Sequence, residues 1–240
     1  MNRRSFLNLA GTGGIALTAA VTGGALWSIQ PKRAIAADLN PLEPDVALKR
    51  LMEGNQRFMQ LKSEHPGQSW ARMKQVAKAQ HPFAALLSCA DSRVPPEILF
   101  DAGLGDLFDI RVAGNIVIPE VLGSLEYAAD ILSTPLIMVL GHKRCGAVTA
   151  AVQEEILPSN IDSFVKAIKP AILKTKDQSS DDPVDQAVIA NVQYQIEKLK
   201  QNSTLLSQRL LDGKLKIVGG RYDLDTGEVT LIKENQTYGR

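Results

Sequence analysis

Residues 136–148 read LIMVLGHKRCGAV, and this stretch decides the fold. Its first five residues, 136–140, are all apolar, which suits a strand that is buried on both faces. Two glycines then bracket a turn that carries His142 and Cys145, and a helical stretch at 146–156 follows. A buried strand that leads through a polar turn into a helix is typical of an α/β protein with a parallel sheet.

The same alternation of apolar runs and helical stretches continues on either side. Further apolar runs suited to strands lie at 83–88, 107–112, 214–218 and 228–232. Helical stretches are expected at 45–61, 69–78, 118–132, 161–174 and 184–211. Because strands that alternate with helices imply helical crossovers, we predict an α/β fold: a mostly parallel central sheet of about five strands with helices on both faces. Gly219-Gly220 and the residues 225–227 are expected to form the turn into a final edge hairpin.

The N-terminus is expected to lie outside this fold. A twin-arginine pattern, RRSFL, occupies residues 3–7, and an uncharged stretch rich in Ala, Gly, Leu and Thr runs to residue 30. The small residues at 34–36 match an A-x-A cleavage site. We therefore expect residues 1–36 to be a signal for the twin-arginine export machinery, which places the protein in the periplasm or elsewhere outside the cytoplasm. The stretch is also about long enough to span a bilayer, so an uncleaved signal would leave a membrane tether.

Length and charge narrow the class of protein. A chain of 240 residues with 45% hydrophobic and 22% charged residues is expected to form one globular domain, here residues 37–240. Four of the 27 basic residues and none of the 26 acidic residues fall in residues 1–36, so residues 37–240 carry a net charge of −3. This balance argues against a nucleic-acid-binding protein, which would need a basic patch.

Polar side chains with metal-binding chemistry follow two of the expected strands. Cys89 comes directly after residues 83–88, and His142 comes directly after residues 136–140. Ligand sites in open α/β sheets lie beyond the carboxyl ends of strands, so both side chains are expected at such a site. The chain has only two cysteines, Cys89 and Cys145. In an exported protein one disulfide is the ordinary interpretation of such a pair, and it competes here with a metal site.

Two thiolates and one neutral imidazole are a zinc ligand set. Cys89, His142 and Cys145 match the Cys2His combination of catalytic zinc sites, which leave a fourth position to water, whereas structural zinc sites are closed by four protein ligands. The other histidines, His65 and His81, lie away from the strand ends. No H-E-x-x-H pattern is present, so a metalloprotease is not indicated.

Asp91 and Arg93 complete the group of polar residues after the first strand. If this segment is extended, Cys89, Asp91 and Arg93 point to the same side. Arg93 would then hold Asp91 ionised through a two-pronged ion pair, and Asp91 would accept a hydrogen bond from the water at the metal. An isolated Asp–Arg pair is more often a surface ion pair of little consequence, but C-x-D-x-R and H-x-x-C together at two strand ends favour a site.

At these residues the chain resembles the β-class carbonic anhydrases. The matching segments are CADSRVP at 89–95, GDLF at 105–108, RVAGN at 111–115, SLEYA at 124–128, GHKRCGAV at 141–148 and GGRYDLDTG at 219–227. The resemblance extends over nearly all of residues 42–233.

The resemblance implies zinc-dependent, reversible hydration of carbon dioxide to bicarbonate. One zinc ion per chain would be held by Cys89, His142 and Cys145, and Asp91 with Arg93 would form the catalytic dyad. Members of this family are dimers or larger, so a homodimer or a dimer of dimers is implied, with the active site at a subunit interface. Gln80, Phe108 and Tyr127 stand at positions that bind substrate in the family. Taken without the resemblance, they would be a loop residue and two core aromatics.

Two other functions stay open from the sequence. One is a hydrolase of carbonyl sulfide or carbon disulfide on the same scaffold, and the other is a zinc-binding or thiol-redox protein without hydration activity. Leu86 stands where members with an inhibitory bicarbonate site often have Trp, so that regulatory site is expected to be absent.

Overall fold

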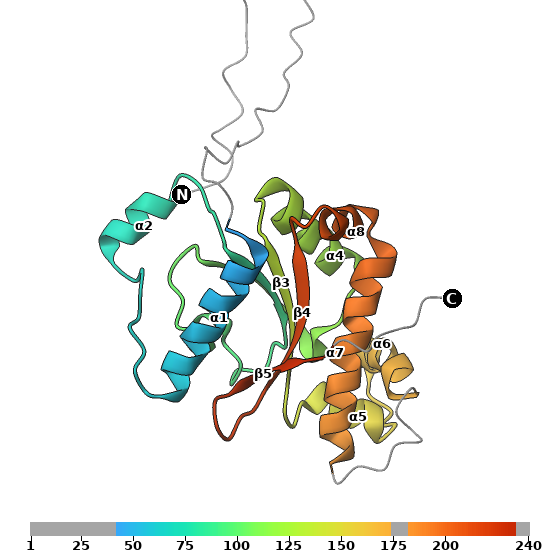
Figure 1. The fold of residues 1–240 in the computed structure, drawn as a ribbon. Helices are drawn as coiled ribbons and strands as arrows, with labels where there is room; N and C mark the ends of the chain where they lie inside the picture. Colours follow the sequence, from blue (N-terminus) through green and yellow to red (C-terminus); the bar gives the residue numbers. More distant parts are fainter. Residues whose placement is uncertain (1–41, 174–181, 234–240) are drawn as a thin grey trace, which may run out of the picture. The chain divides into compact units, whose positions relative to one another are not determined.

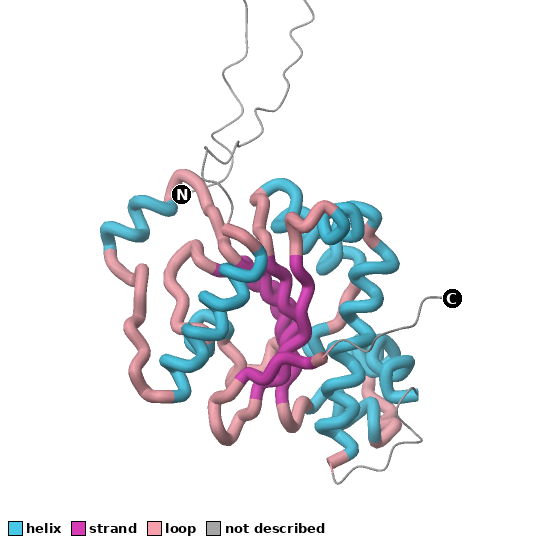
Figure 2. The backbone as a smooth tube through the Cα atoms, viewed as in Figure 1, coloured by secondary structure: helices cyan, strands magenta, loops and turns pink. Residues whose placement is uncertain are grey.

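The computed structural model describes residues 42–173 and 182–233, which lie within one compact unit. A five-stranded sheet at its centre has the strand order β2-β1-β3-β4-β5 (Figure 1, Figure 2). The strands are β1 Ala84–Ser88, β2 Leu107–Arg111, β3 Leu136–His142, β4 Lys216–Tyr222 and β5 Val229–Ile232. The first four run parallel and β5 is antiparallel to β4, which confirms the predicted sheet. The export signal expected at residues 1–36 lies outside the described residues.

Helices cover both faces of the sheet, as predicted. The helices are α1 Pro44–Met59, α2 Trp70–Val76, α3 Pro96–Leu99, α4 Pro119–Glu126, α5 Gly146–Val152, α6 Asp162–Leu173, α7 Pro183–Asn202 and α8 Thr204–Leu211. Short 3-10 turns occur at Ala113–Asn115 and Ser159–Ile161, and a π-helical turn continues α4 at Tyr127–Ile131. Among the described helices, none is both long enough and apolar enough to cross a membrane.

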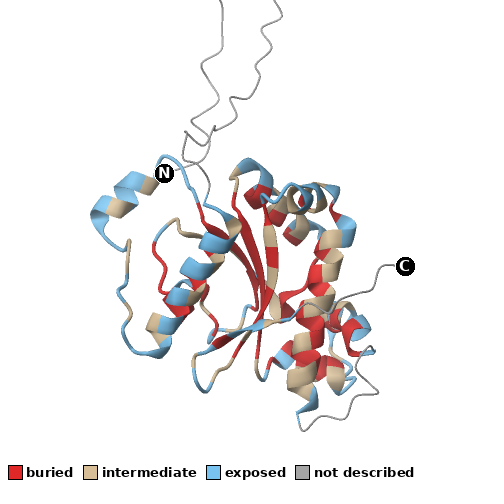
Figure 3. Ribbon diagram, viewed as in Figure 1, coloured by how far each residue is buried: buried red, intermediate tan, exposed pale blue. Residues whose placement is uncertain are grey.

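The core is divided by the sheet into two layers. Because successive side chains of a strand point to opposite faces, Ala84 and Leu86 of β1 pack toward α1 and α3, whereas Ala85 and Leu87 pack toward α4, α7 and α8. Every residue of β1 and β3 is buried (Figure 3). A third cluster, beyond the carboxyl ends of these strands, joins α5, α6 and the first half of α7 around the two cysteines.

Two sequence predictions about the C-terminal half were wrong. The single helix expected at 184–211 is interrupted at Ser203, whose side chain accepts a hydrogen bond from the Leu206 N–H and caps α8. Gly219-Gly220 lies within β4 and does not form the turn. A Cβ atom at Gly219 would lie 2.8 Å from Val192 Cγ1, so the absence of a side chain lets α7 approach the strand closely.

Asp109 is an unusual side chain for the edge strand β2. Its two carboxylate oxygens are buried and accept no hydrogen bond from any donor in the described part of the chain. Burial, together with the negative charge and side-chain contact of Glu97, raises the pKa of Asp109 to about 8. The folded protein therefore holds a proton there at pH values at which the unfolded chain has released it.

Replacing Asp109 by asparagine is expected to stabilise the protein most strongly in alkaline solution. A carboxyl group with a raised pKa contributes less to stability as the pH rises from about 4 to about 8. Since an unsatisfied buried polar group costs about 1–3 kcal/mol, the variant should gain a few degrees in melting temperature at pH ~8.5 and little at pH ~5. Differential scanning calorimetry of parent and variant at both pH values measures this. Equal gains at the two pH values would show that Asp109 does not titrate in this range.

Candidate metal centre

Three buried side chains converge beyond the carboxyl ends of β1 and β3. Cys89 follows the last residue of β1, His142 ends β3, and Cys145 is the N-cap of α5. One ligand atom from each residue lies within 4.8 Å of the other two. The exposed fractions are 5% for Cys89, 0% for His142 and 1% for Cys145. The predicted ligands are therefore brought together, although 53 positions of sequence separate Cys89 from His142.

The imidazole of His142 is oriented for metal binding. Its Nδ1 lies 3.0 Å from the carbonyl oxygen of Lys143, which can only accept a hydrogen bond, so Nδ1 carries the proton. Its Nε2 is buried and has no hydrogen-bond partner among the described residues. A buried, unpartnered nitrogen with a free lone pair next to two sulfur atoms is what a neutral histidine ligand presents.

The two thiols have the spacing of ligands to one ion. Cys89 Sγ and Cys145 Sγ are 4.0 Å apart, and the residues are not joined by a disulfide. Two sulfur atoms that bind a tetrahedral zinc ion at ~2.3 Å each would be roughly 3.8 Å apart. The residues therefore fit zinc, and this spacing favours a metal site over the disulfide that the sequence left open.

The environment of the thiols favours negative charge on Cys89. The hydrogen bond with Cys145, helped by the backbone N–H groups of Gly114, at 3.4 Å, and of Asp91, lowers the pKa of Cys89 to about 4. The same hydrogen bond, together with burial, raises the pKa of Cys145. In the protein without metal the pair thus keeps one proton between the two sulfur atoms, and a divalent cation would displace it.

Asp91 and Arg93 form a two-pronged ion pair beside this group. Arg93 Nε donates to Asp91 Oδ1 at 2.9 Å, and Arg93 NH2 donates to Asp91 Oδ2 at 2.7 Å. These hydrogen bonds hold the pKa of Asp91 well below its usual range. Asp91 Oδ2 is also 3.8 Å from His142 Nε2, so an ionised carboxylate oxygen faces the metal-binding side of the imidazole.

The local backbone differs from the extended segment that the sequence analysis assumed. The chain turns at Ser92 and Arg93, and the Val94 N–H donates to the Asp91 carbonyl oxygen at 3.0 Å. The Arg93 N–H also donates to Asp91 Oδ1 at 2.9 Å. An aspartate that bonds the backbone two residues on makes its own turn, and this turn brings Arg93 back to the carboxylate.

Arg111 supports the same turn and was given no role from the sequence. From the end of β2, its Nε donates to the Cys89 carbonyl oxygen at 3.2 Å and its NH2 donates to the Asp91 carbonyl oxygen at 2.6 Å. One guanidinium thus fixes the backbone on both sides of Ala90. The RVAGN segment that carries Arg111 was visible in the sequence, but its partner residues were not.

A second set of ion pairs fixes the turn between His142 and Cys145. Arg144 donates two hydrogen bonds of 2.8 Å to Asp225, and Lys143 donates a third at 3.1 Å. Asp225 lies in the connection between β4 and β5, so the expected hairpin turn also braces the ligand turn.

The three expected substrate-binding residues lie at the other end of the strands. Gln80 is exposed in the loop before β1, and Phe108 is paired with Ala85 near the amino end of β2. Tyr127 is 45% exposed, and its ring centroid is 6.2 Å from that of Phe108. Four strand residues of ~3.3 Å each put Ala85 about 13 Å from Cys89. The structure therefore brings Phe108 and Tyr127 together, but away from the metal-binding residues of their own chain.

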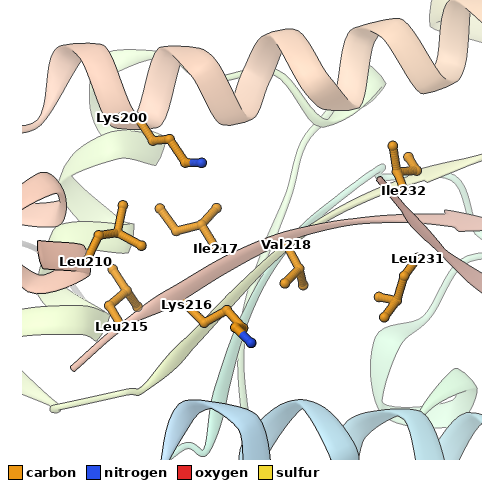
Figure 4. A pocket seen from close by; sticks show the side chains of 8 residues that line it. All are labelled: Lys200, Leu210, Leu215, Lys216, Ile217, Val218, Leu231 and Ile232. Carbon is orange, nitrogen blue, oxygen red and sulfur yellow. The ribbon is translucent and has the colours of Figure 1, made fainter. Parts of the chain in front are cut away.

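An open groove of ≈ 400 Å³ lies at the amino end of β4 (Figure 4). Its lining comes from α7, α8 and the two C-terminal strands: Lys200, Leu210, Leu215, Lys216, Ile217, Val218, Leu231 and Ile232. Because the metal-binding residues follow the carboxyl ends of β1 and β3, this groove is not part of the candidate metal centre.

Comparison with known proteins agrees with this geometry. A family model described as carbonic anhydrase matches residues 84–229. Carbonic anhydrase 2 of Mycobacterium tuberculosis is 41% identical over 192 residues, which cover 78% of this chain and 92% of that protein. The solved β-carbonic anhydrase CcaA superposes with a TM-score of 0.61 at 30% identity and covers 78% of this chain and 95% of its own. The β-carbonic anhydrase of Coccomyxa, solved with acetazolamide, has a TM-score of 0.61 at 27% identity. The match covers 77% of this chain and 86% of that protein. The chain belongs to the β-carbonic anhydrase family, which is zinc-dependent.

Proposed function

We propose that this chain catalyses the reversible hydration of carbon dioxide to bicarbonate and a proton, with one zinc ion held by Cys89, His142 and Cys145. The observation that carries the proposal is the position of Asp91. Its ionised Oδ2 lies 3.8 Å from the unpartnered Nε2 of His142, where it can act on a small molecule bound beside the metal.

The residues around the metal have separable tasks. Zinc supplies Lewis acidity, which makes water a usable nucleophile near neutral pH. Asp91 accepts a hydrogen bond from the attacking water at Oδ2, which aims the oxygen lone pair at the carbon of the substrate. Arg93 keeps Asp91 ionised and fixes its plane through two hydrogen bonds. Arg111 holds the backbone of the turn, so the carboxylate keeps its position during the reaction.

Stopped-flow measurement of carbon dioxide hydration on the zinc-loaded protein tests the proposal. Turnover far above the buffer rate, with one zinc per chain by metal analysis, is the expected result. The hydrolysis of carbonyl sulfide or carbon disulfide is not favoured, because the relatives compared above are named carbonic anhydrases. One zinc per chain without hydration activity would contradict the proposal.

The working unit that we propose is a homodimer, or a dimer of dimers. Gln80, Phe108 and Tyr127 cannot line the metal centre of their own chain from the amino ends of the strands. A second subunit can bring its copies of these residues to the metal centre, and the half-exposed Tyr127 suits such a contact. Analytical ultracentrifugation is expected to give at least twice the chain mass. A monomer with full hydration activity would contradict a shared site.

Residues 1–36 serve, in the same proposal, as a twin-arginine export signal, and residues 37–240 form the single zinc-dependent catalytic domain. The support is the RRSFL pattern and the A-x-A run before the folded unit. Intact-mass analysis of protein from the periplasmic fraction is expected to show cleavage near residue 36, whereas an uncleaved signal would place the protein in the membrane fraction. Full-length protein that stays in the cytoplasm would refute export.

A further inference from the structure

We propose that two buried amide side chains on α7, Asn191 and Gln195, position the sulfur atom of Cys89 for zinc. They act through the loop at Gly114, because their side-chain hydrogen bonds go to Gly114, to Val117 and to each other and not to a metal-binding residue. The inference rests on the proposed role of Cys89 as a zinc ligand.

Gly114 is the link between α7 and the metal centre. Its N–H donates to Cys89 Sγ at 3.4 Å. On the other side of the same residue, its carbonyl oxygen accepts a hydrogen bond of 2.9 Å from Asn191 Nδ2. A shift of α7 or of the loop would therefore move a backbone donor that faces this sulfur atom.

Gln195 fixes the orientation of Asn191. Its Nε2 donates to Asn191 Oδ1 at 2.9 Å, which leaves Nδ2 of Asn191 to point at Gly114. Its Oε1 accepts a hydrogen bond of 2.8 Å from the Val117 N–H. The two amides are four residues apart on one face of α7, and both are 0% exposed. Together they hold the loop at both Gly114 and Val117.

The loop backbone is in a conformation that needs this support. Gly114 has a φ of 71°, in the left-handed region, and a Cβ atom there would lie 2.6 Å from Ile168 Cδ1. Glycine permits this conformation but does not select it, because its backbone has several accessible states. Three interactions select the state in which the N–H faces Cys89: the hydrogen bond that Asn191 donates to the loop, the one that Gln195 accepts from it, and the contact with α6.

The effect of the two amides on stability is separate from their effect on the Gly114 N–H. The neighbouring buried residues of α7, including Val188 and Val192, are apolar. Replacing both amides by apolar groups removes the hydrogen bond between them on both sides. It also leaves the Gly114 carbonyl oxygen and the Val117 N–H without these partners, so some stability is lost, and the control variant must lose backbone hydrogen bonds as well. What apolar residues could not do is orient a backbone N–H toward a thiolate. Groups that hydrogen-bond or orient a metal ligand typically change metal affinity about 10–100-fold when they are removed.

The test is the double variant Asn191→Leu/Gln195→Met, which removes both amides together, so that neither amide is left buried without the other. Zinc affinity, measured by competition with a chelator, is expected to fall about 10–100-fold. In the cobalt-substituted protein, the sulfur-to-cobalt charge-transfer band is expected to shift. The matched control is Asn55→Leu. Asn55 is also a buried helical asparagine that bonds backbone groups, at Leu99, Gly227 and Val229, but none of these is a metal-binding residue.

The outcomes separate this inference from the proposed function. If the parent binds zinc and the double variant binds it equally well with the same cobalt spectrum, the positioning role is wrong and the proposed function stands. If the parent binds no zinc, the proposed function itself fails. An equal loss of zinc affinity in Asn55→Leu would mean that lowered stability explains the effect, and would overturn the inference. If the double variant does not fold, the single variant Gln195→Met replaces it, because it keeps the bond from Asn191 to Gly114. Its zinc affinity is expected to fall by a smaller factor. An unchanged zinc affinity and cobalt spectrum would count against the inference.

Discussion

Replacing Cys145 by serine is expected to reduce carbon dioxide hydration to the buffer rate and to release the metal. In the proposed metal centre Cys145 is one of three side chains that share the ion, and it is 1% exposed. Zinc binding of about 10–16 kcal/mol over four ligands corresponds to roughly 2.5–4 kcal/mol for each ligand. Loss of one ligand should therefore weaken zinc binding by about 100- to 1,000-fold. Stopped-flow kinetics and metal analysis after dialysis measure the two effects.

The same variant also distinguishes a metal site from a redox pair. If the thiols bind zinc, the intact mass of the native parent corresponds to two reduced cysteines, and Cys145→Ser loses the metal. If the two thiols instead form a redox disulfide, the intact mass of the native parent is lower by two hydrogen atoms, and the parent holds little zinc. Thr149→Ser is a matched control, because Thr149 lies one turn further along α5 and its hydroxyl donates to the Cys145 carbonyl oxygen and not to the sulfur atom. Full retention of zinc and activity by Cys145→Ser would remove Cys145 from the site.

The sequence predicted the features of the site that depend on short-range order. The apolar run at 136–140 and the two glycines around His142 and Cys145 were sufficient to place both ligands at a strand end. The rule that ligand sites lie at the carboxyl ends of parallel strands then brought Cys89 to the same place. These predictions succeeded because each depends on a few consecutive residues and on a general property of parallel sheets.

Features that depend on distant partners were not predicted. Nothing local to Arg111 indicates that it bonds the carbonyl oxygens of Cys89 and Asp91, 22 and 20 positions away. Likewise Asn191 meets Gly114 across 77 positions, and only the packing of α7 brings them together. The glycine pair at 219 was assigned to a turn because glycine is common there, whereas close helix packing on β4 is the actual requirement.

Replacing Asp91 by asparagine is expected to lower turnover about 100- to 10,000-fold while one zinc per chain remains bound. The carboxylate is close to the metal-binding atoms, at 3.8 Å from His142 Nε2, but is not one of the three ligands. Asparagine keeps the size of the side chain and loses the charge that accepts a proton or a hydrogen bond from the attacking water. Loss of a positioned acid–base or orienting group typically has an effect of this size. Stopped-flow turnover and metal analysis on the same sample measure both quantities.

The control for Asp91→Asn is an exposed ion pair outside the proposed site and outside the π-helical turn that carries Tyr127. Asp212 pairs with Lys214 at 3.9 Å in the exposed connection between α8 and β4, so Asp212→Asn removes a surface ion pair without touching the site. Its turnover is expected to match that of the parent. If Asp91→Asn loses zinc as well as activity, the carboxylate supports the metal-binding residues and does not act on water. If it keeps both zinc and full turnover, Arg93 has no charge to orient and the dyad has no role in the reaction. Only retained zinc with lost turnover is consistent with an orienting role for Asp91.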